Sequence, residues 1–117
     1  MENRYPYLFN PITIGNMTVK NRIFQSAVGT HLATENYEVT KEHLAYFEER
    51  AKGGVGLITT ECIVMQPDTR YTTMHGLGLF EDRMIDELKK ITDLVHQYDV
   101  RIAAQIMHPS SVATPKY

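Results

Sequence analysis

The sequence lacks the features that mark several classes of protein. It has a single cysteine, Cys62, so no disulfide can form within the chain, and one cysteine alone cannot hold a structural zinc ion. A lone cysteine is typical of a reducing compartment, and we expect a cytoplasmic location. No stretch of 18 apolar residues occurs, and no charged start followed by an apolar run opens the chain. We therefore expect neither a membrane span nor a secretory signal.

The sequence also lacks a marked excess of positive or negative charge. Twelve Lys and Arg residues stand against 14 Asp and Glu residues, and the only adjacent basic pair is Lys89 and Lys90 on an expected helix. Nucleic acid and anionic membranes are therefore not expected partners. No repeat, low-complexity tract or Gly/Ser linker divides the 117 residues, so we expect one globular unit.

Hydrophobic periodicity and turn residues predict alternating strands and helices. β-forming residues flank Gly15 and Asn16, a hairpin turn signal, which predicts a hairpin over residues 11–20. Thr40 can cap a helix that Gly53 and Gly54 end, and a second helix is expected over 81–98. Its expected buried face comprises Met84, Ile85, Leu88, Ile91, Leu94, Val95 and Tyr98. Mostly apolar segments predict buried strands at 22–28, 55–60 and 100–107.

This order predicts an α/β fold with parallel strands joined by right-handed crossovers. An open doubly wound sheet and part of a (β/α)8 barrel both fit, and both place their sites beyond the carboxyl ends of the strands. The segment 62–80 is expected to be a loop, longer than is usual in compact domains, and loops of that length often belong to a site.

Polar residues stand at the ends of all three expected strands, and we predict that they converge. They are Ser26, Gly29, Thr30 and His31 after the first strand, Glu61 and Cys62 after the second, and Gln105 and His108 after the third. The amide of Gln105 suits the edge of a heterocycle, and small residues near Gly29 leave backbone open to a flat ligand.

Each of these candidates also has a structural interpretation. In that interpretation Gln105 bonds only to neighbouring backbone, and the small residues only form a tight turn. Cys62 is either a reactive thiol or an inert small hydrophobe. Glu61 is either a buried base or the partner of a cation such as Arg22.

The remaining motifs do not indicate a metal site or a dinucleotide-binding site. The five histidines have no metal-binding spacing, so no metal is expected, and His43 and His96 are expected on solvated helix faces. The run Gly76, Leu77, Gly78 lacks the third glycine of a dinucleotide fingerprint and is interpreted as loop flexibility.

Four motifs in order carry a family likeness: LFNPITIG at 8–15, KNRI at 20–23, YFEERAKGGVGLI at 46–58 and QIMH at 105–108. The chain resembles the old yellow enzyme family, within the branch of NADH:flavin oxidoreductases that includes 2,4-dienoyl-CoA reductases and enoate reductases. The resemblance implies an FMN-containing (β/α)8 barrel. It also implies hydride transfer from NADH or NADPH through the flavin to a small enone or enoyl substrate.

The resemblance also implies site residues. The residues expected at the flavin are Ser26, Ala27, Val28, Gly29, Cys62 and Gln105. His31 lies near a substrate-side position, and His108 is more structural than catalytic. Family members usually continue with glycine and arginine after this histidine, whereas here Pro109, Ser110 and Ser111 follow.

A whole barrel needs about 250 residues, so the resemblance implies the N-terminal portion of one. Residues 1–20 would be the N-terminal segment and hairpin, and 21–117 the first three barrel strands with two helices. Alone, the chain is expected to bind FMN weakly, to be inactive and to self-associate through its open edge. The alternatives are a non-catalytic half-barrel that serves as an interaction module, and another flavin barrel such as a relative of dihydroorotate dehydrogenase or dihydrouridine synthase.

Overall fold

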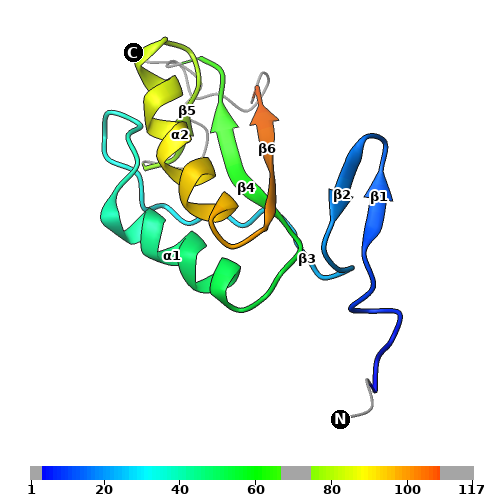
Figure 1. Cartoon of the computed structure of the whole chain (residues 1–117). Helices are drawn as coiled ribbons and strands as arrows, with labels where there is room; N and C mark the ends of the chain where they lie inside the picture. The colour runs from blue at the N-terminus through cyan, green and yellow to red at the C-terminus, as the bar shows by residue number, and fades with distance from the viewer. Residues whose placement is uncertain (1–3, 67–74, 109–117) are drawn as a thin grey trace.

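The structure, a computed structural model, describes residues 4–66 and 75–108 (Figure 1). Its elements in chain order are β1 (Ile12–Ile14), β2 (Met17–Val19), β3 (Phe24–Gln25), α1 (Lys41–Lys52), β4 (Leu57–Val64), β5 (Leu77–Gly78), α2 (Arg83–His96) and β6 (Arg101–Met107). The expected order of a hairpin followed by alternating strands and helices is confirmed, with β5 as an addition.

β1 and β2 form the predicted N-terminal hairpin. The two strands pair antiparallel, with Ile14 opposite Met17. Gly15 has a φ of +58°, in the left-handed region that glycine enters without strain. In Figure 1 the hairpin stands beside the main sheet and forms a separate two-stranded sheet, linked to β6 by the side chain of Arg101, which donates to the carbonyl of Thr18 at 3.0 Å.

β4 is the centre of a four-stranded parallel sheet. β3 pairs with the start of β4, where Phe24 lies opposite Leu57, and β5 pairs with its end, where Gly78 lies opposite Val64. β6 runs beside β4 along its whole length. Parallel strands that alternate with helices confirm the α/β class.

The two helices pack side by side on one face of the sheet (Figure 1). α1 begins after Thr40, whose hydroxyl accepts a hydrogen bond from the backbone N–H of His43, and ends at Gly53. α2 buries Met84, Ile91 and Val95. Both predicted helices are confirmed, but Ile85 was placed on the wrong face of α2, since it is 57% exposed.

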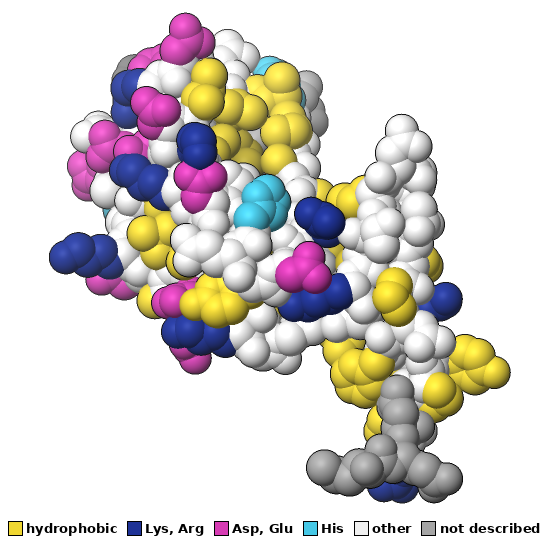
Figure 2. Space-filling view, in the orientation of Figure 1, with side chains coloured by type: hydrophobic (Ala, Val, Ile, Leu, Met, Phe, Trp, Pro, Cys, Tyr) yellow, Lys and Arg dark blue, Asp and Glu magenta, His cyan; other side chains and the backbone are white. Residues whose placement is uncertain are grey.

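The opposite face of the sheet is open among the described residues. The core lies under the helices, where Ile58 and Ile63 of β4 are fully buried. Phe24 of β3 is 55% exposed, and most residues of β6 are exposed. Figure 2 shows charged side chains gathered over the helices and apolar ones beside β6.

The prediction of buried strands at 22–28 and 100–107 is therefore wrong in part. The first shrinks to the two residues of β3, and the second has its predicted extent but is not buried. The physical reason is the same for both: apart from the hairpin at its base, no described segment covers this face of the sheet, and among the described strands β6 pairs only with β4.

The predicted loop at 62–80 is also corrected. β4 continues to Val64, and Leu77 and Gly78 form β5, in which both residues are buried. A Cβ on Gly78 would lie 2.9 Å from the Phe80 ring, so this glycine permits close packing and is not a point of loop flexibility. Pro67 and Asp68 lie outside the described residues.

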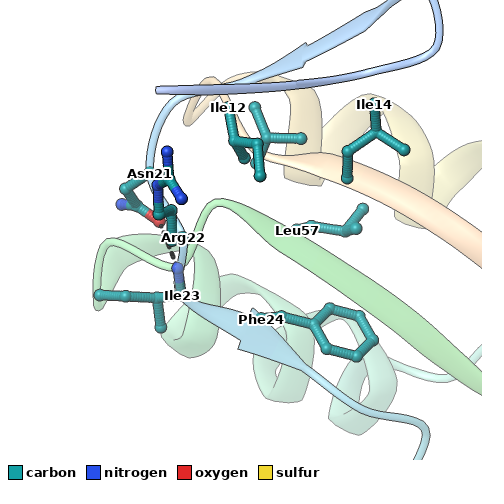
Figure 3. Close-up of a pocket in the computed structure, with 8 residues that line it drawn as sticks. Ile12, Ile14, Asn21, Arg22, Ile23, Phe24 and Leu57 are labelled. Atoms are coloured by element: carbon teal, nitrogen blue, oxygen red, sulfur yellow. Dashed lines mark hydrogen bonds between the residues drawn. The ribbon is translucent and has the colours of Figure 1, made fainter. Parts of the chain in front are cut away.

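The base of the sheet meets the hairpin around a cavity of about 400 Å³. Figure 3 shows Ile12 and Ile14 pointing from the hairpin toward Leu57 and Phe24. Asn21 holds this corner, because its side chain donates to the carbonyl of Gly54 at 2.7 Å and accepts from the N–H of Ile23 at 3.0 Å. The KNRI motif therefore ties the chain before β3 to the turn before β4.

Neither helix of the described residues has the length and apolar character needed to cross a membrane.

The Gly56→Ala substitution tests the close approach at this corner. A Cβ at Gly56 would lie 2.6 Å from Oδ1 of Asn21 and 2.7 Å from Cγ1 of Val19, and neither neighbour can move freely. We expect a loss of about 2 to 3 kcal/mol in the free energy of unfolding, measured by urea denaturation. Gly53→Ala, where the nearest atom is 3.3 Å away, is the control and should lose less. Equal losses would contradict the packing described here.

Candidate functional site

Cys62 and Gln105 meet on the open face of the sheet, at the carboxyl ends of β4 and β6. They are opposite one another in the parallel register, and the thiol of Cys62 donates to Oε1 of Gln105 at 2.8 Å. Gln105 is exposed and Cys62 is half-buried. Because Oε1 accepts from the thiol, the Nε2 hydrogens of Gln105 point elsewhere, and they donate to no described residue.

A β-bulge in β4 puts Cys62 on this face. The register steps from Thr59 opposite Ala103 to Cys62 opposite Gln105, so Thr60 and Glu61 both oppose one residue of β6. Without the extra residue, strand alternation would place Glu61 on the open face and Cys62 among the core residues. The bulge therefore exchanges the positions of a carboxylate and a thiol.

The side chain of Thr60 compensates for the ladder hydrogen bonds that the bulge interrupts. Its hydroxyl accepts from the backbone N–H of Gln105 at 3.2 Å and donates to the carbonyl of Glu61 at 2.9 Å. Both groups belong to buried or partly buried backbone, where an unpaired polar group is unfavourable. Thr60 is thus a part of the site that the sequence did not reveal.

Glu61 faces inward into a hydrogen-bonded group with His43 and Thr30. Its Oε1 accepts from Nε2 of His43 at 3.0 Å, and its Oε2 accepts from the backbone N–H of Thr30 at 2.5 Å and from the Thr30 hydroxyl at 2.6 Å. Burial alone would raise the pKa of the Glu61 carboxyl, but the hydrogen bonds from His43 and Thr30 outweigh burial and lower it. The carboxylate is therefore ionised at neutral pH.

The structure corrects one prediction at this group and excludes one of the partners considered for Glu61. His43 was expected on a solvated helix face but has no exposed surface, and Glu61, which is 3% exposed, bonds to His43 and Thr30 and makes no ion pair with Arg22. The signal for His43 was present, because His43, Phe47 and Ala51 follow one another at intervals of four on a single helix face.

The segment 26–29 follows β3 and belongs to no strand. Ser26, Val28 and Gly29 are exposed, and Ala27 is half-buried. Thr30, the next residue, is fixed to Glu61, and Glu61 precedes Cys62. A continuous path of covalent and hydrogen bonds thus connects Gly29 with Cys62 and Gln105.

The remaining histidines have separate roles. His31 is exposed and has a φ of +57°, and its Nε2 lies 3.7 Å from where a Cβ of Gly29 would stand. His108 follows β6 and shares a hydrogen bond of 3.1 Å with Oε1 of Gln66, which follows β4. His96 is exposed at the end of α2, as expected.

Residues 4–66 and 75–108 contain no group of three or more side chains placed to hold a metal ion.

Comparison with known proteins gives one family. The sequence profile of the NADH:flavin oxidoreductase / NADH oxidase family matches residues 7–116. The chain is similar to an NADH oxidase of Thermoanaerobacter brockii, with 32% identity over 111 residues, which are 95% of this chain and 17% of the oxidase.

Two solved structures show the same arrangement of elements. The complex of 2-naphthoyl-CoA reductase with 2-naphthoyl-CoA has a TM-score of 0.86 and 29% identity over 94% of this chain and 17% of its own chain. The old yellow enzyme of Trypanosoma cruzi has a TM-score of 0.78 and 33% identity over 89% of this chain and 27% of its own. The chain thus spans less than a third of each of these proteins, and its sheet is part of a (β/α)8 barrel.

The lowered pKa of Glu61 predicts a specific loss of stability in acid. The unfolded carboxyl takes up a proton near pH 4.3, above the pKa of the folded one, so the contribution of Glu61 is complete at pH 7 and lost as the pH falls through the folded value. Glu61→Gln should lose about 2 to 3 kcal/mol at pH 7 and show a shallower decline below pH 5.

The measurement is urea denaturation at pH 7, 5, 4 and 3. Glu48→Gln is the control, because Glu48 is a carboxylate of lowered pKa that bonds to Tyr98 on the surface. It should keep most of the decline of the unsubstituted chain. An identical decline for Glu61→Gln and the unsubstituted chain would show that Glu61 does not carry the effect.

Proposed function

Since the chain belongs to the NADH:flavin oxidoreductase / NADH oxidase family, we propose that it forms the first flavin-binding part of an FMN-dependent ene-reductase. Such an enzyme would reduce activated C=C bonds of small enone or enoyl substrates with NADH or NADPH. When bound, FMN supplies the hydride transfer between nicotinamide and alkene. The observation that carries the proposal is the Cys62–Gln105 pair on the open face of the sheet.

The described residues fit a flavin ring at this face. The thiol of Cys62 holds Oε1 of Gln105, which leaves the amide N–H groups available for the carbonyl and nitrogen acceptors of the pyrimidine edge. Alanine and glycine at 27 and 29 leave room and open backbone beside a flat ring. Under this proposal Ser26, Ala27, Val28, Gly29 and Cys62 pack on the ring, and Gln105 binds its edge.

His31 is the candidate for the substrate side of the ring, because it is exposed and follows the flavin-facing segment directly. His108 is assigned to structure, because its hydrogen bond to Gln66 links the chain after β6 to the chain after β4. The single cysteine supports a reducing, cytoplasmic location.

The chain covers only part of its relatives, so we expect the remaining barrel to be needed for activity. A ring bound at this face would have protein on one side only, and affinity depends on how much of a ligand is enclosed. FMN binding by the chain alone should therefore be weak, and turnover should be absent.

A second function also has an observation in its favour. Most of β6 is exposed, and its far edge pairs with no described strand. An unpaired apolar edge favours pairing with another chain. The alternative to an enzyme segment is thus a non-catalytic half-barrel that associates with a partner or with itself.

Complementation tests the enzyme function. The chain is co-expressed with the part of the Trypanosoma cruzi old yellow enzyme that follows the matched region, and FMN binding and NADH oxidation with 2-cyclohexenone are measured. We expect FMN bound to the assembly and enone-dependent NADH oxidation, neither of which the chain alone should show strongly. An assembly that forms without binding FMN would favour the interaction module.

Gln105→Ala in the same assembly tests the assigned residue. Loss of hydrogen bonds worth about 1.4 kcal/mol predicts roughly tenfold weaker FMN binding. Gln97→Ala is the matched control, because Gln97 is an exposed glutamine at the end of α2, away from the strand ends. Equal affinity of the two variants would remove Gln105 from the flavin site.

Self-association is tested by Ile106→Lys. Ile106 is 47% exposed on β6, and a lysine on an edge strand opposes strand pairing between chains. We expect the substitution to shift the chain toward monomer in sedimentation velocity. Ile85→Lys is the matched control, because Ile85 is 57% exposed on α2. A similar shift for both variants would mean that the edge of β6 is not the contact.

A further inference from the structure

The buried group of Glu61, His43 and Thr30 lies directly behind the candidate flavin face. Thr30 follows Gly29 in the chain, and Glu61 precedes Cys62. Each residue of the pair Thr30 and Glu61 is thus covalently joined to a residue of the open face, while their side chains meet on the helix side of β4. The positions of Gly29 and Cys62 on the open face therefore depend on the hydrogen bonds between Thr30 and Glu61 on the helix side.

Hydrogen positions in this group follow from its acceptors. The ionised Glu61 carboxylate has no hydrogen to give, so the Thr30 hydroxyl, its backbone N–H and Nε2 of His43 must all donate. The Thr30 oxygen also lies 2.9 Å from Nε2 of His43, which places the imidazole hydrogen between two acceptors. Nδ1 of His43 has no hydrogen-bond partner among the described residues, so Nε2 alone anchors the ring.

Apolar packing could fill the space between α1 and β4 as well as this group does. A buried carboxylate must overcome the unfavourable loss of its hydration, and comparable apolar residues are often at least as stabilising. What the carboxylate adds is direction, because two donors of Thr30 converge on one oxygen, Oε2. Those two bonds fix the backbone of Thr30 as well as its side chain.

We propose that Glu61, held by His43, is a positioning residue that fixes Thr30 and thereby sets the segment 26–29 beside Cys62 and Gln105. The assignment of a flavin to this face rests on the proposed function, but the positioning of the segment does not. Thr30 and Glu61 do not touch the ring in this scheme; they act through Gly29 and Cys62.

Amide hydrogen exchange on the whole chain tests the positioning. Thr30→Val removes the hydroxyl and keeps the shape, and Thr30→Ser keeps the hydroxyl. We expect exchange in the peptide covering 26–31 to be at least tenfold faster in Thr30→Val and in Glu61→Gln, beyond any change in α2. Thr30→Ser should restore protection to within threefold. Thr92→Val is the matched control, because among the described residues the Thr92 hydroxyl bonds only to the helix carbonyl of Lys89.

Two results would overturn the inference. The first is exchange at 26–31 that changes no more than exchange in α2, which would mean that the group contributes only global stability. The second is protection in Thr30→Ser no better than in Thr30→Val, which would mean that the hydroxyl is not the anchor.

Riboflavin binding by the assembly used for complementation separates this inference from the proposed function. Riboflavin is the probe because it carries the flavin ring without the phosphate, and binding is followed by quenching of its fluorescence. We expect about tenfold weaker binding in Thr30→Val and less than twofold change in Thr92→Val. If not even the assembly with the unsubstituted chain binds riboflavin, the flavin assignment loses support while the exchange result still decides the positioning. If binding is unaffected although exchange rises, the segment does not form part of a flavin site.

Discussion

The extra residue in β4 is the constraint on which the site depends. A β-strand presents alternate residues to its two faces, so a thiol and a carboxylate that are adjacent in sequence must point in opposite directions. The bulge at Thr60 and Glu61 decides which of the two faces the helices. The carboxylate of Glu61 then lies on the helix side, where it meets His43 on α1 and Thr30 before α1. The thiol of Cys62 lies on the open face, where it orients Gln105. One irregularity in backbone pairing thus organises both layers.

Local signals in the sequence were sufficient for the elements. Gly15 permits the left-handed turn, Thr40 offers a side-chain acceptor to a helix start, and the periodicity of α2 requires one buried face. These features depend on residues close together in the chain. Residues that meet across the fold were harder to predict. Arg22 was as reasonable a partner for Glu61 as His43, because the sequence does not state which side of β4 the carboxylate faces.

Two further errors have a common origin. β5 has two residues, too few for any pattern to indicate a strand, and it exists because Gly78 allows its backbone to approach Phe80 and Tyr37 closely. The strand at 22–28 was predicted to be buried because apolar residues in a parallel sheet usually are. Burial, however, is a property of what lies against a residue, and Phe24 borders the cavity beneath the hairpin and stays 55% exposed. The likeness to barrel proteins that are several times longer explains why a side chain suited to an interior is exposed here.

The role of β4 as the shared partner has a consequence for synthesis on the ribosome. Among the described strands β3, β5 and β6 pair with β4 and not with one another, and β6 provides by far its longest pairing. About forty residues separate the end of β4 from the end of β6, which corresponds to roughly 2 to 9 seconds of translation at typical rates. During that interval β4, the longest of the described strands, would have one edge without its main partner. Nascent chains of this protein are therefore candidates for chaperone binding between the emergence of β4 and the emergence of β6.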